Sequence, residues 1–167
     1  REGVTDKVFF DREKGSFDLK SRILEINSKT GLYPLYIAYT LFRARKADFE
    51  NLGLIEDTSK YSVEEEHAIW DDILLDNIYV VCNTPMAARI TKRTLVGFRD
   101  VSDDRVNIKS IKLVEESSNN RDKLIKDLKR PGFWHKGAEG EEMKFNAVVG
   151  NPPYQTTTNV NNRQNPI

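Results

Sequence analysis

The sequence is short of three things, and each shortage excludes a class of protein. It has one cysteine, Cys82, so it cannot form an internal disulfide or a disulfide-stapled secreted scaffold. It has no apolar run near the roughly 20 residues that a bilayer-spanning helix needs, and residues 1–4 lack the apolar segment of a signal peptide. It also has no net charge, because 26 Lys and Arg balance 26 Asp and Glu. A polyanionic partner would therefore have to meet a local basic surface.

The chain nevertheless has the material for one hydrophobic core. It has 167 residues, of which 38% are hydrophobic and 10% aromatic. This length and composition fit a single domain and exclude a disordered tail. We therefore expect a soluble, intracellular globular domain.

Apolar runs and helical patterns alternate along the chain. The continuous apolar runs, each followed by a polar turn, lie at residues 22–26, 77–82 and 145–149. Such runs are typical of parallel strands covered on both faces. Helical patterns lie at residues 33–46, 62–75, 85–96 and 120–129. Residues 106–109 fit a strand or the start of a helix equally well. This alternation predicts an α/β fold with a mainly parallel sheet.

The tetrapeptide Asn151-Pro152-Pro153-Tyr154 directly follows the last apolar run. Open α/β sheets bind ligands at the carboxyl ends of their strands. The prolines fix φ and favour an extended Asn151, which can then be aimed into a crevice. The Asn151 side chain and the Pro152 carbonyl can each accept one N–H of a planar exocyclic amine, and Tyr154 can stack on its ring. The arrangement therefore suits alkylation of such an amine.

Three segments resemble one enzyme family. Residues 145–155, Phe-Asn-Ala-Val-Val-Gly-Asn-Pro-Pro-Tyr-Gln, resemble catalytic motif IV of N6-adenine DNA methyltransferases. These enzymes use S-adenosylmethionine and accompany, or are fused to, restriction endonucleases. Residues 78–95 are similar to the family's motif II, and residues 23–31 occupy the place of motif I. Motif IV follows without an inserted target-recognition segment, which is similar to the gamma group.

The resemblance implies a fold, a reaction and a set of site residues. The fold is α/β, a Rossmann-like S-adenosylmethionine-dependent methyltransferase sheet with flanking helices, truncated after the motif IV strand. The substrate is double-stranded DNA with a flipped adenine, and endonuclease and target-recognition domains are fused or associated. Catalysis is assigned to Asn151, Pro152, Pro153 and Tyr154, and cofactor binding to Glu25, Asn27, Thr30, Gly31, Cys82 and Asn83.

The chain departs from the family pattern in motifs I and II. The turn after the first run, residues 27–31, contains one glycine where the family has a glycine-rich turn. Cys82 stands where the family has the acid that holds the ribose hydroxyls, and we expect it to be a small buried residue. Asn83 is the nearest polar substitute for that acid.

The resemblance also divides the chain. Residues 1–167 are a partial methyltransferase catalytic domain, expected in the bacterial cytoplasm with no membrane partner. Its parts are a cofactor-binding half at 20–98 with a helical insertion near 47–76, a segment at 105–155 that leads to the catalytic motif, and a polar loop at 156–167. No metal is expected, because His67 and His135 lack partners at metal-ligand spacing.

Two alternative functions remain open. The same tetrapeptide serves methyltransferases that act on glutamine amides of proteins or on RNA guanine. The single-glycine turn and Cys82 also fit a non-catalytic scaffold that binds DNA or a partner subunit.

Overall fold

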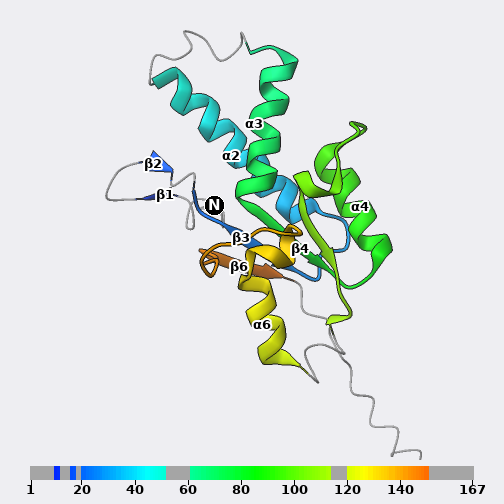
Figure 1. The fold of residues 1–167 in the computed structure, drawn as a ribbon. Coiled ribbons are helices and arrows are strands. Elements are labelled where there is room, and N and C mark those ends of the chain that lie inside the picture. Colours follow the sequence, from blue (N-terminus) through cyan, green and yellow to red (C-terminus); the bar gives the residue numbers. More distant parts are fainter. Residues whose placement is uncertain (1–9, 12–15, 18–19, 52–60, 114–119, 151–167) are drawn as a thin grey trace, which may run out of the picture.

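The protein, described here from a computed structural model, is built on a four-stranded parallel sheet (Figure 1). The structure describes residues 10–11, 16–17, 20–51, 61–113 and 120–150. The strands of the sheet are β3 (Ile23–Ile26), β4 (Ile78–Cys82), β5 (Asn107–Ser110) and β6 (Ala147–Gly150). Their order across the sheet is β5-β4-β3-β6, and each neighbouring pair is parallel. The prediction of a mainly parallel sheet is therefore confirmed.

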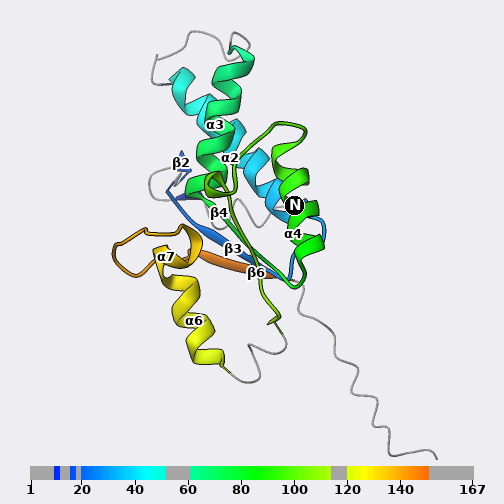
Figure 2. The same ribbon diagram turned by 45° about the vertical axis from the view of Figure 1, so that its right-hand side comes forward.

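Helices cover both faces of this sheet (Figure 2). On one face lie α2 (Leu32–Asn51), α3 (Val63–Asp76) and α4 (Pro85–Val96), and on the other lie α6 (Arg121–Lys129) and α7 (Pro131–Trp134). The 3-10 helix η2 (Asp103–Arg105) precedes β5, and the short strands β1 (Phe10–Asp11) and β2 (Ser16–Phe17) form a separate antiparallel pair. Among the described residues, no helix is both long and apolar enough to cross a membrane.

Strand residues alternate between two hydrophobic clusters, one on each face. In β4, Ile78, Val80 and Cys82 pack toward α2, α3 and α4, whereas Tyr79 and Val81 pack toward α6 and α7. All five residues of β4 are buried. This double burial explains why the strand is a continuous apolar run with no alternation of polar residues.

The predicted elements occur in the structure with small shifts at their ends. The first two apolar runs contain β3 and β4, the third overlaps β6, which extends one residue further to Gly150, and residues 106–109 contribute to the strand β5. The predicted helices correspond to α2, α3, α4 and α6. Pro131 follows α6 and begins the short helix α7, as proline can at a first helical turn. The pairing of β1 with β2 was not predicted.

Side chains at their amino ends fix where α3 and α4 begin. Ser62 accepts a hydrogen bond from the Glu65 backbone while the Glu65 side chain accepts one from the Ser62 backbone, which is a capping box. Thr84 caps α4 by accepting from Ala87 N at 3.1 Å, and Pro85 follows it at the first helical position. The start of α4 is thereby set directly after β4.

Candidate active site

The strand order of the sheet reverses beside β3. From β3 the chain steps to β4 and β5 on one side, whereas β6 lies on the other side of β3. Open α/β sheets bind ligands outside the carboxyl ends of the strands at such a switch point. Ile26 and Gly150, which are paired in register at the ends of β3 and β6, therefore border the crevice expected at this switch point.

The turn after β3, residues 27–31, turns sharply into α2. Asn27 and Gly31 both have positive φ, 65° and 75°, which asparagine and glycine tolerate best. The Ser28 backbone N–H donates to Val81 O at 3.1 Å, so the turn is bonded to β4. Thr30 is exposed, and its carbonyl accepts from Thr94 Oγ1 at 2.6 Å. The predicted cofactor residues Asn27, Thr30 and Gly31 thus share one turn.

Helix α4 packs closely against the glycine of this turn. A Cβ atom at Gly31 would lie 3.1 Å from both Cα and Cγ2 of Thr91. The positive φ of Gly31 adds strain to any side chain there. One glycine therefore suffices for the turn, and it stands where the helix approaches.

Glu25, the penultimate residue of β3, is a buried carboxyl group. Its exposed fraction is 5%, and its Oε2 atom has no hydrogen-bond partner among the residues that the structure describes. Burial raises the pKa of Glu25 to about 7, and a hydrogen bond with the Ser28 side chain acts in the opposite direction. A cation beside Oε2 would satisfy this oxygen and favour the charged carboxylate.

Cys82, at the end of β4, is fully buried, as expected for a small apolar residue. Its Sγ atom lies 3.6 Å from Thr91 Oγ1. Burial raises the pKa of the Cys82 thiol, the hydrogen bond with Thr91 opposes this, and the charge of Glu25 adds to the rise. The next residue, Asn83, is exposed, and its Oδ1 accepts from Leu113 N at 3.0 Å. Asn83 therefore holds the segment that follows β5.

Gly150 ends β6 beside the end of β3. A Cβ atom at this position would lie 2.7 Å from Ile26 O, closer than such atoms can approach. Glycine is therefore required where these two strands end. The predicted catalytic residues Asn151, Pro152, Pro153 and Tyr154 come next in the sequence and lie outside the described residues.

Two residues of this site, Ser28 and Thr91, are not among those predicted from the sequence. Both are at most 2% exposed, and their hydroxyl oxygens lie 3.4 Å apart. The available signal was Thr91 itself, a polar residue four positions before the core residue Leu95 on an amphipathic helix. A polar side chain on the core-facing side of a helix indicates a buried hydrogen-bond partner.

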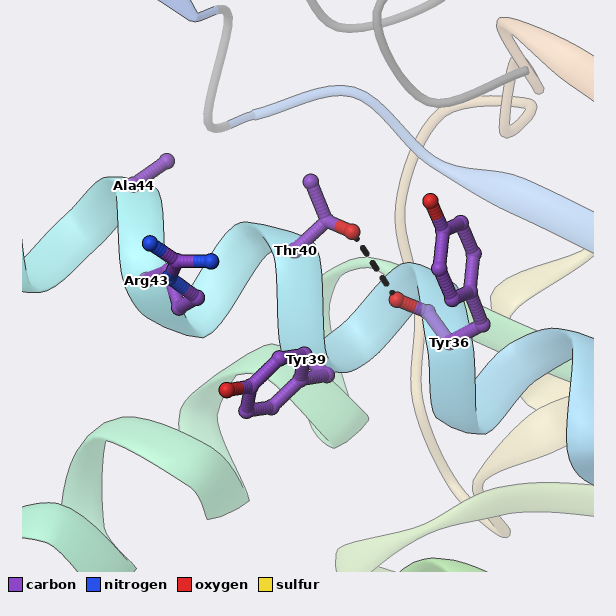
Figure 3. Close-up of a pocket in the computed structure, with 5 residues that line it drawn as sticks. All are labelled: Tyr36, Tyr39, Thr40, Arg43 and Ala44. Carbon is purple, nitrogen blue, oxygen red and sulfur yellow. Dashed lines mark hydrogen bonds between the residues drawn. The ribbon is translucent and has the colours of Figure 1, made fainter. Parts of the chain in front are cut away.

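The structure also records a pocket away from this crevice, on α2 (Figure 3). It has a volume of about 370 Å³ and is lined by Tyr36, Tyr39, Thr40, Arg43 and Ala44. Thr40 Oγ1 donates to Tyr36 O at 3.0 Å within the helix. None of the predicted site residues lines this pocket. Within the described ranges, no group of three or more His, Cys, Asp or Glu side chains could hold a metal ion.

Strand order and flanking helices define the class as a Rossmann-like methylase fold of the α/β type. The sequence model of the Eco57I restriction-modification methylase family matches residues 76–166, more than half of the chain. The chain belongs to this family, which makes it a DNA methyltransferase of the restriction–modification class. A search of curated proteins found no match.

Proposed function

We propose that the protein transfers a methyl group from S-adenosylmethionine to N6 of an adenine flipped out of double-stranded DNA. The observation that carries this proposal is the position of Gly150. It ends β6 at the switch point of the sheet, and the sequence continues directly into Asn151-Pro152-Pro153-Tyr154. This tetrapeptide resembles the catalytic motif of the gamma group of N6-adenine DNA methyltransferases.

The residues around β3 fit the proposed cofactor. The unpartnered Oε2 of Glu25 is suited to the ammonium group of its methionine part. The methionine carboxylate would suit the amino end of α2, where backbone N–H groups and the helix dipole favour an anion. Asn27, Thr30 and Gly31 supply the turn between these groups, and Asn83 is the exposed polar side chain after β4. When bound, the cofactor supplies a methyl group on a positively charged sulfur.

The proposed catalytic residues act on the acceptor amine. The Asn151 side chain and the Pro152 carbonyl each accept one hydrogen of the adenine amino group, which frees the nitrogen lone pair for attack. Tyr154 stacks on the flipped base, a contact worth roughly 1–3 kcal/mol. Extrusion of the base from the duplex is needed because N6 is otherwise out of reach. The reaction then depends on positioning and needs no covalent enzyme intermediate.

We further propose that the chain divides by role. Residues 20–98 are the cofactor-binding half, with an insertion near 47–76 that contains the end of α2 and all of α3. Residues 105–155 lead to the catalytic motif. The endonuclease and target-recognition functions of a restriction–modification protein would be supplied by fused or associated domains.

The test is to identify the methylated product. The protein is incubated with methyl-labelled S-adenosylmethionine and duplex DNA, and the digested nucleosides are separated. We expect label in N6-methyladenine. Asn151→Ala should lower the rate by at least about a hundredfold, because it removes an acceptor that acts on the transition state. Asn120→Ala is the matched control, since Asn120 is exposed and makes no side-chain cap at α6.

Other products would identify the alternatives. Label in cytosine, RNA or a glutamine-containing peptide in place of adenine would refute the adenine assignment. A folded wild-type protein that neither binds the cofactor nor transfers methyl groups would indicate a non-catalytic scaffold. Full activity of Asn151→Ala would refute the role of the motif.

A further inference from the structure

A buried chain of polar side chains connects β4, α4 and β3. The Cys82 thiol lies 3.6 Å from Thr91 Oγ1, and the Thr91 hydroxyl lies 3.4 Å from Ser28 Oγ. Ser28 in turn hydrogen-bonds the carboxyl group of Glu25. All four residues are at most 5% exposed, so water does not compete for these contacts.

The hydrogen-bonding capacity of Ser28 determines which groups donate and which accept in this series of hydrogen bonds. A hydroxyl group donates one hydrogen bond and accepts two. Ser28 Oγ accepts from Thr91 Oγ1 and from the Gly31 backbone N–H at 3.2 Å. With both acceptor positions used, its own hydrogen is left for Glu25. Thr91 therefore determines which way the Ser28 hydroxyl points.

We infer that Thr91 is a positioning residue that, through Ser28, orients the Glu25 carboxylate toward the cation of the cofactor. This inference rests on the proposed function, because it assigns a role toward the cofactor that Glu25 would bind. It involves no contact between Thr91 and the cofactor. The resemblance assigns no site residue to α4, and Thr91 would give this helix a role at the site.

Helix α4 also stabilises the conformation of the turn between β3 and α2. Thr91 packs against Gly31, where a Cβ atom would be 3.1 Å away, and Thr94 Oγ1 bonds the Thr30 carbonyl at 2.6 Å. Two threonines of α4 thus hold the two ends of the Thr30–Gly31 peptide. The turn between β3 and α2 keeps its shape through these contacts although it has one glycine.

The test separates the Thr91 hydroxyl from the Thr91 methyl group. Thr91→Val keeps the shape and removes the hydroxyl, whereas Thr91→Ser keeps the hydroxyl and removes the methyl group. Thr40→Val is the matched control, because Thr40 also lies in a helix and its hydroxyl bonds Tyr36 O, outside the crevice. The affinity for S-adenosylmethionine is measured by calorimetry. The titration of Glu25 is followed by carboxyl NMR on the full chain without cofactor.

We expect Thr91→Val to weaken cofactor binding by about three- to tenfold, the equivalent of one lost neutral hydrogen bond. It should also raise the pKa of Glu25, because a hydrogen bond that favours the carboxylate is weakened. In Thr91→Ser the affinity and the pKa of Glu25 should stay close to those of the wild type, and in Thr40→Val both should be unchanged. A loss of packing alone would lower the melting temperature without this pattern of rescue.

Several results would overturn the inference. If the pKa of Glu25 is the same in Thr91→Val as in the wild type, the inference is wrong, whatever the affinity for S-adenosylmethionine. Equal losses in Thr91→Val and Thr91→Ser would assign the effect to the methyl group. If the wild type binds the cofactor and Thr91→Val shifts the pKa of Glu25 without changing the affinity, the orientation of Glu25 does not contribute to cofactor binding. If the wild type binds no cofactor, the proposed function fails, and the titration alone decides the role of Thr91.

Discussion

At the scale of single residues, the carboxyl group of Glu25 couples burial to protonation. Burial raises its pKa from 4.5 to about 7, and the hydrogen bond with Ser28 only partly opposes this. The folded protein therefore holds a proton that the unfolded chain releases at lower pH. A raised pKa of this kind gives stability that is complete below pH 4.5 and is lost as the pH rises through 7.

This linkage predicts the behaviour of Glu25→Gln. The amide has no charge at any pH, so the variant should gain stability relative to the wild type between pH 4.5 and 8. A shift from 4.5 to about 7 corresponds to at most about 3 kcal/mol. Urea denaturation gives the free energy of unfolding of both proteins at pH 5 and pH 8. The difference between the two proteins, compared between the two pH values, isolates Glu25, because the effects of other titrating groups cancel. The same difference at both pH values would show that Glu25 titrates normally in the folded state.

At the scale of elements, one side chain of β5 is bonded to three other elements. Asn107, at the start of β5, is 1% exposed. Its Nδ2 lies within 3.1 Å of the carbonyl oxygens of Leu74, Leu75 and Ile78. Its Oδ1 lies 2.5 Å from Nε2 of His135, which follows α7. The end of α3, the start of β4 and the end of α7 are thereby fixed to β5.

Removing this side chain should loosen the junction. Asn107→Ala leaves buried carbonyl groups without a donor, and we expect a loss of about 2–3 kcal/mol in the free energy of unfolding. Asn83→Ala is a suitable comparison, because Asn83 is exposed and its recorded bond is a single one to Leu113 N. Urea denaturation should rank Asn107→Ala well below Asn83→Ala in stability. Equal stabilities would contradict the structural role of Asn107.

The same elements show what the sequence could predict. The capping box of α3 and the Thr84-Pro85 start of α4 are local signals, and the structure contains both helices where these signals place them. Strand β5 was ambiguous, because its residues Asn-Ile-Lys-Ser carry little strand character without the neighbouring β4. Local sequence thus predicts helix starts better than it predicts a short, half-polar strand.

The candidate site shows the same division. Glu25, within an apolar run, and Gly31, in the turn after it, are assigned from the family resemblance, and their cofactor roles remain predictions. The link between Ser28 and Thr91 could not be predicted, since 63 residues separate them and their contact depends on how α4 packs against the turn. The roles of Asn151 to Tyr154 remain predictions that rest on the resemblance and on the position of Gly150.

At the scale of the whole molecule, cofactor binding and protonation should be linked. Without a ligand, the pKa of Glu25 is about 7, so most molecules carry the protonated carboxyl group at pH 6. A bound ammonium group beside Oε2 would favour the carboxylate, and binding at pH 6 should therefore release a proton. Affinity should consequently rise with pH, by roughly tenfold between pH 6 and 7.5, if only the carboxylate form binds.

Calorimetry with S-adenosylmethionine in two buffers of different ionisation enthalpy measures this proton release directly. The wild type should show a buffer-dependent heat at pH 6 that shrinks at pH 7.5, where less of Glu25 is protonated. Glu25→Gln should bind more weakly and with the same heat in both buffers. Binding should also raise the stability of the folded protein, by about 2.7 kcal/mol at a free concentration of one hundred times Kd. A wild-type heat at pH 6 that does not depend on the buffer would contradict this prediction, because the Glu25 proton would then stay in place when the cofactor binds.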